Sequence, residues 1–402
     1  MPARSWLRPL PGGTMGSPGV HVFGLIIAVT GIVTVEFMIV GLLPAISSEL
    51  QVSLQKAGLL VSVFALSAAV AGPVVTFFTA AVPARVALSL GLIAFGLANV
   101  VVVVSPEFEV AVLARAVQGA LLTPLVSVGS DVAARLAAAG AGGRAIGQVN
   151  FGTVLGTVIA VPSAVLAVEL VGWQGIYVLT GTLVCLAGVL IWSVLPQLST
   201  SSTISATVQA RLLTRPGFAA QLIVTALLFT GMFTIFGYIP VYLAEVFSLT
   251  GPDVGCVLFG FGAAGFLGNW LASRLIDRDP KNLTVAVSLI LACVMFVSAA
   301  DTPGLILGGA IIVLWGGTHT AAFVVCQVRV MKAGAPAAAF AGSLNISAAN
   351  LGIAAGSWLG GTVVRYVDVT WLGPTASAVC VCAALLSFRL QGADSPAGET
   401  IS

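Results

Sequence analysis

One acid and one arginine stand inside long apolar stretches of this chain: Glu36 within 21–44 and Arg115 within 110–133. A charge at the centre of a membrane helix costs at least ~2.5 kcal/mol, so it normally faces a bundle interior or a water-filled path. At 1.5 Å per residue, the two residues lie ~12 and ~8 Å from the same end of their helices. We therefore expect them to pair and Glu36 to exchange a proton. The alternatives are a static ion pair, a Glu36 that faces the lipid headgroups and, for Arg115, an anchor to carbonyl groups at helix ends.

Polar and aromatic residues of other apolar stretches are candidates for a substrate cavity. They are Gln118, Gln148, Asn150, Phe229, Phe233, Phe236, His319, Asn345 and Asn350. The three phenylalanines recur at i, i+4 and i+7, and this face suits a planar or amphipathic compound; ordinary helix packing is the alternative. The amides bind substrate or hold helices together. For His319 we expect a hydrogen-bonded core residue beside Thr318 and Thr320, with a second proton site as the alternative.

Composition places these residues in a lipid bilayer. Hydrophobic residues make up 58% of the 402 residues and charged residues only 7%, whereas soluble domains carry roughly 25% charged residues. A helix needs ~20 apolar residues to cross the hydrocarbon. Such stretches lie at 21–44, 56–80, 85–104, 110–133, 144–167, 173–196, 217–243, 253–276, 282–300, 303–327, 337–363 and 371–391. We predict an all-α integral membrane protein with twelve transmembrane helices.

The twelve stretches divide into two halves of six. Residues 58–88 resemble 255–283, and residues 134–156 resemble 327–352, at offsets close to 197. Parallel repeats of this kind build transporters with a path between two pseudo-symmetric halves. The predicted parts are an N-terminal tail (1–20), a first half (21–196), a Ser/Thr-rich linker (197–216), a second half (217–391) and a C-terminal tail (392–402).

Basic residues indicate the orientation, because cytoplasmic loops are enriched in Lys and Arg. With the N-terminus inside, 13 of the 16 basic residues fall in cytoplasmic segments, and only Lys56 and Arg365 fall outside. Both termini are therefore expected in the cytoplasm, with the protein in the inner (plasma) membrane.

Several function classes are excluded. No Gly-x4-Gly-Lys phosphate loop is present, so the chain does not couple to ATP directly. The six cysteines form no Cys-x-x-Cys pair, which argues against a zinc site or a disulfide framework, and a net charge of +2 predicts no nucleic-acid partner. We expect no enzyme activity, cofactor or metal. The expected partners are protons, lipids and a small-molecule substrate, and a monomer suffices.

Three segments carry a family resemblance. They are VEFMIVGLLPAISSELQVSLQKAGLLVSVFALSAAVAGP (35–73), RAVQGALLTPLVSVGSDVAARL (115–136) and GRAIGQVNFGTVLGTVIAVP (143–162). They resemble the first, fourth and fifth helices of proton-coupled drug and sugar efflux proteins of the major facilitator superfamily, including arabinose-efflux-like and chloramphenicol-efflux-like members. The resemblance spans roughly residues 20–391 and implies that Arg115, with Gln118, serves the proton relay.

The resemblance also suggests residues that gate the pathway. They are Arg85, Gly152, Gly156, Pro162, Arg274, Asp277 and Arg278. The family signature after the second helix is reduced here to TAAVPARVAL (79–88), with Arg85 as its only charge, and is better kept in GNWLASRLIDR (268–278). The fifth helix lacks the usual Gly-Pro pair, and Gln174 stands where relatives commonly have arginine.

Together these features predict proton-coupled efflux of a small amphipathic compound by alternating access. The cargo is an antibiotic, such as a chloramphenicol-like drug, or a sugar or other metabolite. The first alternative is uptake or facilitated diffusion of a sugar, nucleoside or amino acid. The second is a membrane sensor that transports nothing.

Overall fold

The computed structural model describes residues 18–79, 81–137, 142–198, 212, 214–249, 251–276, 278–299, 305–334 and 338–393. Most of the predicted tails and most of the predicted linker lie outside these residues. The regular elements of the described part are helical: α1 (Pro18–Glu49), α2 (Leu54–Thr79), α3 (Ala84–Val104), α4 (Phe108–Leu136), α5 (Gly142–Val194), α7 (Pro216–Phe236), α8 (Ile239–Val246), α9 (Gly251–Leu275), α10 (Pro280–Val297), α11 (Leu305–Ala333), α12 (Ala338–Tyr366), η1 (Val369–Trp371) and α13 (Leu372–Ala393).

Ten helices of the described residues are long and apolar enough to cross a membrane. One of them, α5, contains both the fifth and the sixth predicted spans. The chain turns between them at Gly172, where φ is 69°, a conformation that glycine adopts without steric cost. The seventh span consists of α7 and α8 with a break at Gly237 and Tyr238, and α12 is the eleventh. The predicted twelve-helix architecture is confirmed.

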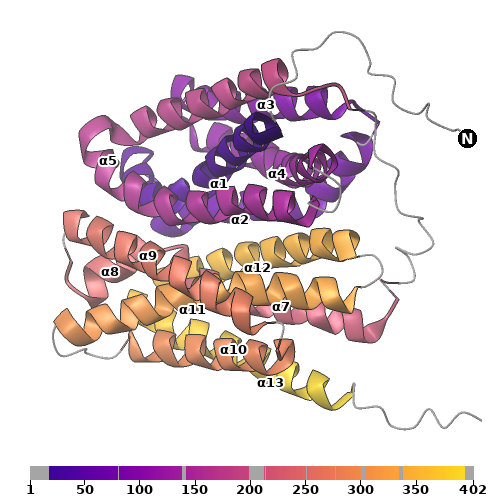
Figure 1. The fold of residues 1–402 in the computed structure, drawn as a ribbon. Coiled ribbons are helices and arrows are strands. Elements are labelled where there is room, and N and C mark those ends of the chain that lie inside the picture. Colours follow the sequence, from indigo (N-terminus) through magenta and orange to yellow (C-terminus); the bar gives the residue numbers. More distant parts are fainter. Residues whose placement is uncertain are drawn as a thin grey trace, which may run out of the picture.

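The helices form two bundles that lie side by side (Figure 1). The first bundle holds α1–α5 and the second holds α7–α13. The packing pairs correspond: α1 packs on α5, α2 on α4 and α3 on α5, while α7 packs on α12, α9 on α11 and α10 on α13. Between the bundles, the main contacts are α2 with α12 and α5 with α9. We call these contacts the seam.

Glycines bring the paired helices of each bundle close together. Gly152 and Gly156 of α5 face the main chain of α1, so an added Cβ would lie 2.7 Å from the Ile26 carbonyl oxygen or 2.8 Å from that of Thr30. In the second bundle, Gly352 and Gly356 of α12 face α7 in the same way. Small residues at four-residue spacing allow membrane helices to approach closely, and both bundles use this device.

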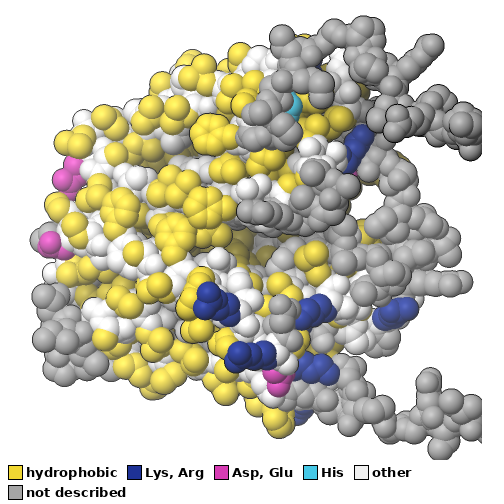
Figure 2. Space-filling view, in the orientation of Figure 1, with side chains coloured by type: hydrophobic (Ala, Val, Ile, Leu, Met, Phe, Trp, Pro, Cys, Tyr) yellow, Lys and Arg dark blue, Asp and Glu magenta, His cyan; other side chains and the backbone are white. Residues whose placement is uncertain are grey.

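The outer surface is apolar around the middle of the helices, as Figure 2 shows in yellow. Large side chains such as Phe77 (76% exposed) and Leu170 (84%) have no protein neighbour over most of their area, as lipid-facing residues require. Glu49, Glu107 and Glu169 lie near helix ends or turns on one side of the band, which we call the acidic end. Arg274 and Arg389 lie near the opposite, basic end.

Candidate functional site: a buried charge network and a cavity at the seam

Arg115 of α4 ties three helices of the first bundle together. Its side chain is 2% exposed. Nε donates to the carbonyl oxygen of Leu60 in α2 (3.1 Å), Nη1 to that of Val35 in α1 (3.1 Å) and Nη2 to that of Glu36 (3.0 Å). The guanidinium also lies over the Phe64 ring, 4.1 Å from its centroid. Arg115 therefore binds carbonyl oxygens, as one alternative proposed, but those of Val35 and Glu36 lie in the interior of α1 and not at a helix end.

Glu36 lies beside this arginine without forming an ion pair with it. The residue is 8% exposed. Among the described residues, its carboxylate has neither a hydrogen bond nor an ion pair within 4.0 Å. The expected direct pairing is therefore wrong for this conformation, because carbonyl groups of α1 and α2 occupy the donors of Arg115. The expected proximity holds, since Arg115 contacts the main chain of Glu36 itself.

A polar chain continues from Arg115 across the first bundle. Nη1 of Arg115 donates to Oε1 of Gln118 (3.3 Å), and Nε2 of Gln118 donates to Oδ1 of Asn99 in α3 (2.7 Å). Nδ2 of Asn99 donates to Oγ1 of Thr180 in α5 (3.1 Å). Sequence analysis named Gln118 but missed Asn99 and Thr180. An asparagine in the apolar stretch 85–104 was the available signal.

An aromatic cluster bridges the two bundles. Phe229 and Phe233 stack with ring centroids 6.3 Å apart, and Phe236 lies edge-on to Phe233 at 5.3 Å. From the first bundle, Phe37 stacks on Phe233 at 5.8 Å and contacts Phe236 at 6.4 Å. The predicted aromatic face of α7 is therefore packed against the residue that follows Glu36 in the chain.

His319 of α11 lies in the same cluster. Its ring centroid lies 4.8–5.9 Å from those of Phe233, Phe236, Phe261 and Phe323. Both imidazole nitrogens are buried, and neither has a hydrogen-bond partner in the part of the chain that the structure describes. The expected hydrogen-bonded histidine is wrong, because the Thr318 hydroxyl donates to the carbonyl oxygens of its own helix instead.

A small cavity, of about 20 Å³, lies at the seam. Its lining comes from four helices of both bundles: Thr157, Val158, Val161, Pro162, Phe236, Leu258, Phe261, Gly262, His319 and Thr320. None of these ten side chains carries a formal charge when the histidine is neutral. Of the predicted cavity residues, Phe236 and His319 line this space directly.

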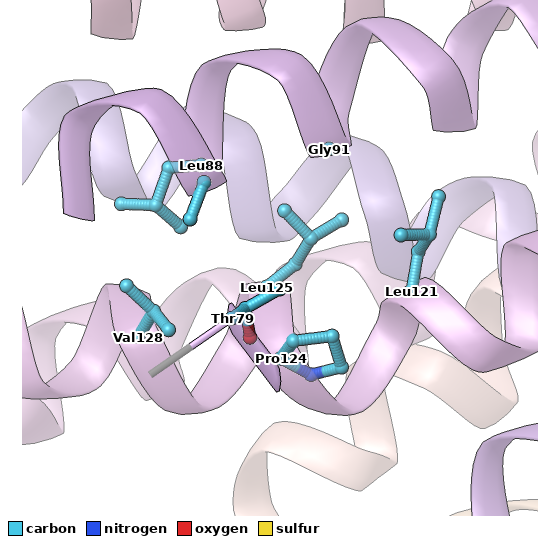
Figure 3. Close-up of a pocket in the computed structure, with 8 residues that line it drawn as sticks. Thr79, Leu88, Gly91, Leu121, Pro124, Leu125 and Val128 are labelled. Carbon is cyan, nitrogen blue, oxygen red and sulfur yellow. The ribbon is translucent and has the colours of Figure 1, made fainter. Parts of the chain in front are cut away.

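A second small cavity, also of about 20 Å³, lies within the first bundle between α3 and α4 (Figure 3). Its lining is apolar apart from Thr79: Leu88, Leu121, Leu125 and Val128 close its walls, and Gly91 leaves room on α3. It lies away from the seam, and the hydroxyl of Thr79, its one polar lining side chain, donates to the Thr76 carbonyl oxygen (3.1 Å).

The predicted amides do not gather at the seam cavity. Asn345 bonds to Thr225 (2.9 Å) and Gln327 (2.6 Å) within the second bundle, so it holds helices together. Asn350 donates to the Ile346 carbonyl oxygen of its own helix (3.0 Å). Gln148 is exposed near the basic end of α5, and the Asn150 side chain lies outside the described part.

A buried arginine of the second bundle corrects another expectation. Arg329 was assigned to a cytoplasmic segment, but α11 continues to Ala333 and leaves this residue 5% exposed. Its Nη2 donates to the Gln221 carbonyl oxygen (2.9 Å) and to Thr225 Oγ1 (3.3 Å). It therefore belongs to the Asn345 network.

The described residues among the predicted gating set have four different environments. Gly152 and Gly156 pack α5 on α1, and Pro162 lines the seam cavity. The guanidinium of Arg85 lies 4.9 Å from the Trp192 ring centroid, and that of Arg274 lies 4.0 Å from the Trp270 ring centroid. Arg278 is exposed, and Asp277 lies outside the described residues.

The described hydrogen bonds between the bundles lie toward the acidic end. Ser357 of α12 donates to the Gly58 carbonyl oxygen (3.1 Å), and Ser62 of α2 donates to that of Ala354 (3.2 Å). Nearer that end, Arg365 donates to Gln55 Oε1 (2.8 Å). The seam is thus locked on the acidic side of the cavity.

Sequence relatives extend along nearly the whole chain. An inner membrane transport protein (YdhP) of Escherichia coli K12 is 29% identical, covering 92% of this chain and 96% of its own. A chloramphenicol efflux pump of Mycobacterium tuberculosis H37Rv is 30% identical, covering 89% of each chain. A Pseudomonas aeruginosa PAO1 protein named transcription regulatory protein OpdE is 30% identical, covering 94% and 95%.

Solved structures share the fold. A crystal structure of a bacterial homolog of the human lysosomal transporter Spinster, inward-facing and occupied, matches with a TM-score of 0.74 at 16% identity, covering 94% of this chain and 98% of that one. The sequence model of the Major Facilitator Superfamily matches residues 25–357, a range that includes helices of both bundles. The resemblance inferred from the sequence is confirmed: the chain belongs to the major facilitator superfamily of membrane transporters.

Proposed function

We propose that this protein exports a small amphipathic compound in exchange for protons, by alternating access between its two bundles. The observation that carries the proposal is the Glu36 carboxylate, which is buried in the first bundle and has no hydrogen-bond or ion-pair partner among the described residues. A carboxylate in such a place is costly and usually serves proton or ion movement. Without a fixed partner, it can gain or lose a proton without breaking a salt bridge.

The position of Arg115 supports a coupling scheme in which the arginine keeps its contacts while Glu36 gains or loses a proton. Its donors hold main-chain carbonyl oxygens of α1 and α2, so proton binding at Glu36 does not have to release the arginine. Arg115 instead supplies a permanent positive charge beside a carboxyl group whose own charge changes. The next residue, Phe37, contacts the aromatic cluster of the second bundle and so connects the proton site with the cavity.

The cargo and the direction rest on other features. The apolar seam cavity suits an amphipathic molecule, and one relative is named a chloramphenicol efflux pump. The distribution of basic residues supports a cytoplasmic position for the basic end. With the seam locked toward the acidic end, we interpret the present conformation as the one that faces the cytoplasm.

Transport by purified protein in liposomes tests the proposal. An imposed pH gradient should drive radiolabelled chloramphenicol against its own gradient in wild type. Glu36→Gln should abolish this accumulation while leaving downhill exchange, whereas Glu107→Gln, an exposed acid at the start of α4, should behave as wild type. Equilibration of chloramphenicol that does not depend on the pH gradient would instead support a facilitator. Intact coupling in Glu36→Gln would show that this residue has no part in the mechanism.

A second candidate is a membrane sensor, favoured by the relative named transcription regulatory protein OpdE. A sensor would bind its ligand without flux. Binding in the absence of any transport, coupled or downhill, would support it. Because chloramphenicol represents only one ligand class, metabolite-excretion profiles of cells with and without the protein should accompany the liposome assay.

A further inference from the structure

His319 is buried and its hydrogen-bonding atoms are unsatisfied among the described residues, an unfavourable combination for a polar side chain. Its side chain is 1% exposed, and neither imidazole nitrogen has a hydrogen-bond partner. A buried polar group without a hydrogen-bond partner is destabilising. The same imidazole lines the seam cavity, so a cargo molecule that enters between the bundles there meets an unsatisfied hydrogen-bonding group.

We propose that His319 is the polar anchor of the cargo site and selects an uncharged aromatic compound with a hydrogen-bonding group. The inference rests on the proposed transport function and specifies the substrate class. A neutral imidazole offers one N–H donor and one acceptor nitrogen. A hydroxyl or amide group of the cargo can form a hydrogen bond with either nitrogen and so satisfies an atom that has no partner among the described residues.

The aromatic part of the ligand follows from the walls of the cavity. Phe236 and Phe261 line it directly, and their ring centroids lie 4.8 and 5.5 Å from that of His319. Aromatic rings prefer offset or edge-to-face neighbours at 4.5–7 Å, which is the spacing within this cluster. A ligand ring inserted beside Phe236 and Phe261 would continue the pattern.

The absence of charge on the ligand follows from the same lining. None of the ten side chains around the cavity is an acid, a lysine or an arginine. A charged ligand would lose its hydration there without gaining an opposite charge, and burying an unpaired charge costs far more than burying a hydrogen-bonded polar group. Thr157 and Thr320 add hydroxyl groups but no charge.

Equilibrium binding in lipid nanodiscs, without a pH gradient, tests the inference. The probes are tritiated chloramphenicol, which is uncharged, and its deacylated amine, which is a cation at neutral pH. Wild type should bind the amine at least tenfold more weakly. His319→Phe keeps a ring but removes both hydrogen-bonding atoms, so its affinity for chloramphenicol should fall about tenfold, as loss of one buried hydrogen bond predicts.

Two further variants separate recognition from folding. His319→Gln restores a donor and an acceptor and should bind chloramphenicol within about threefold of wild type. His21→Phe makes the same substitution at the only other histidine, at the start of α1, and should bind as wild type. Because His319→Phe removes an unsatisfied polar group, its apparent melting temperature should equal or exceed that of wild type.

Three outcomes would overturn the inference: wild type that fails to bind chloramphenicol, His319→Phe that binds it as tightly as wild type, or a preference for the amine. Comparison of the two probes needs no variant, so a misfolded His319→Phe would not prevent the test. Because no gradient is applied, failure here is separate from failure of proton coupling, which the Glu36→Gln transport assay detects.

Discussion

Nη2 of Arg115 lies 3.0 Å from the main-chain carbonyl oxygen of Glu36, while the carboxylate of the same residue has no hydrogen-bond or ion-pair partner among the described residues. The arginine therefore stabilises the helix that carries the acid without neutralising the acid through a direct contact. This arrangement divides two tasks between neighbouring groups. Arg115 keeps α1, α2 and α4 in register, and Glu36 remains available for protonation.

Arg115→Lys should weaken the first bundle although it keeps the charge. A lysine cannot satisfy the carbonyl oxygens of Val35, Glu36 and Leu60 with the geometry of the guanidinium. Leaving one of these buried acceptors unsatisfied costs about 1–3 kcal/mol, so the apparent melting temperature in detergent should fall. Arg135→Lys, in an exposed ion pair with Asp131 on the same helix, should change little. Equal melting temperatures for the two variants would contradict the anchoring role.

Asn99→Ala should destabilise the polar chain that crosses the first bundle. The substitution leaves Nε2 of Gln118 with only the Phe95 carbonyl oxygen (3.2 Å) as acceptor, and we expect a loss of about 1–3 kcal/mol. Thr180→Val should cost less, because it removes a single partner of Asn99. Chemical denaturation followed by tryptophan fluorescence compares the two, and a larger effect of Thr180→Val would show that the order of importance is wrong.

Gly356→Ala should disturb the second bundle. An added Cβ would overlap the carbonyl oxygen of Thr230 in α7, so the helices must separate, at about 1–3 kcal/mol. Gly260→Ala in α9 is the matched control, because no atom lies within 4 Å of the added Cβ. We expect a lower melting temperature only for Gly356→Ala. If both variants have the same melting temperature as wild type, the close approach of α7 and α12 is not required for stability.

Gly58→Val should prevent the seam from closing toward the acidic end. An added Cβ would overlap the hydroxyl oxygen of Tyr238, so the conformation open at that end should gain population. The measurement is maleimide labelling of a cysteine placed at Ser62, a buried seam residue, in a background without the six native cysteines. Labelling should become several-fold faster.

The control for the seam experiment is Gly217→Val at the start of α7, where the added Cβ meets no atom within 4 Å. It should leave the labelling rate of the Ser62 cysteine unchanged. An unchanged rate in Gly58→Val would mean that contact with Tyr238 does not hold the seam closed.

Much of the fold was readable from composition and spacing. In a membrane, an apolar stretch of about 20 residues satisfies its backbone hydrogen-bonding groups by forming a helix. The number and order of the membrane helices therefore followed directly from the sequence. The repeat between the halves was visible as similarity between residues 58–88 and 255–283, whereas the turn at Gly172 was not predicted. The boundary of α11 was misjudged near Arg329, because a basic residue at a helix end can be buried when neighbouring helices supply carbonyl oxygens.

The candidate site was only partly readable. The sequence by itself determined that Glu36 and Arg115 lie in apolar helices at similar depth, and that Phe229, Phe233 and Phe236 share one face. Only the tertiary structure decided that Arg115 binds carbonyl oxygens, that His319 has no hydrogen-bond partner and that Asn345 joins helices. The reason is that these outcomes depend on partners far away in the sequence, such as Leu60, 55 residues from Arg115. A helix that is apolar on all sides carries no periodic signal of which neighbour it will face.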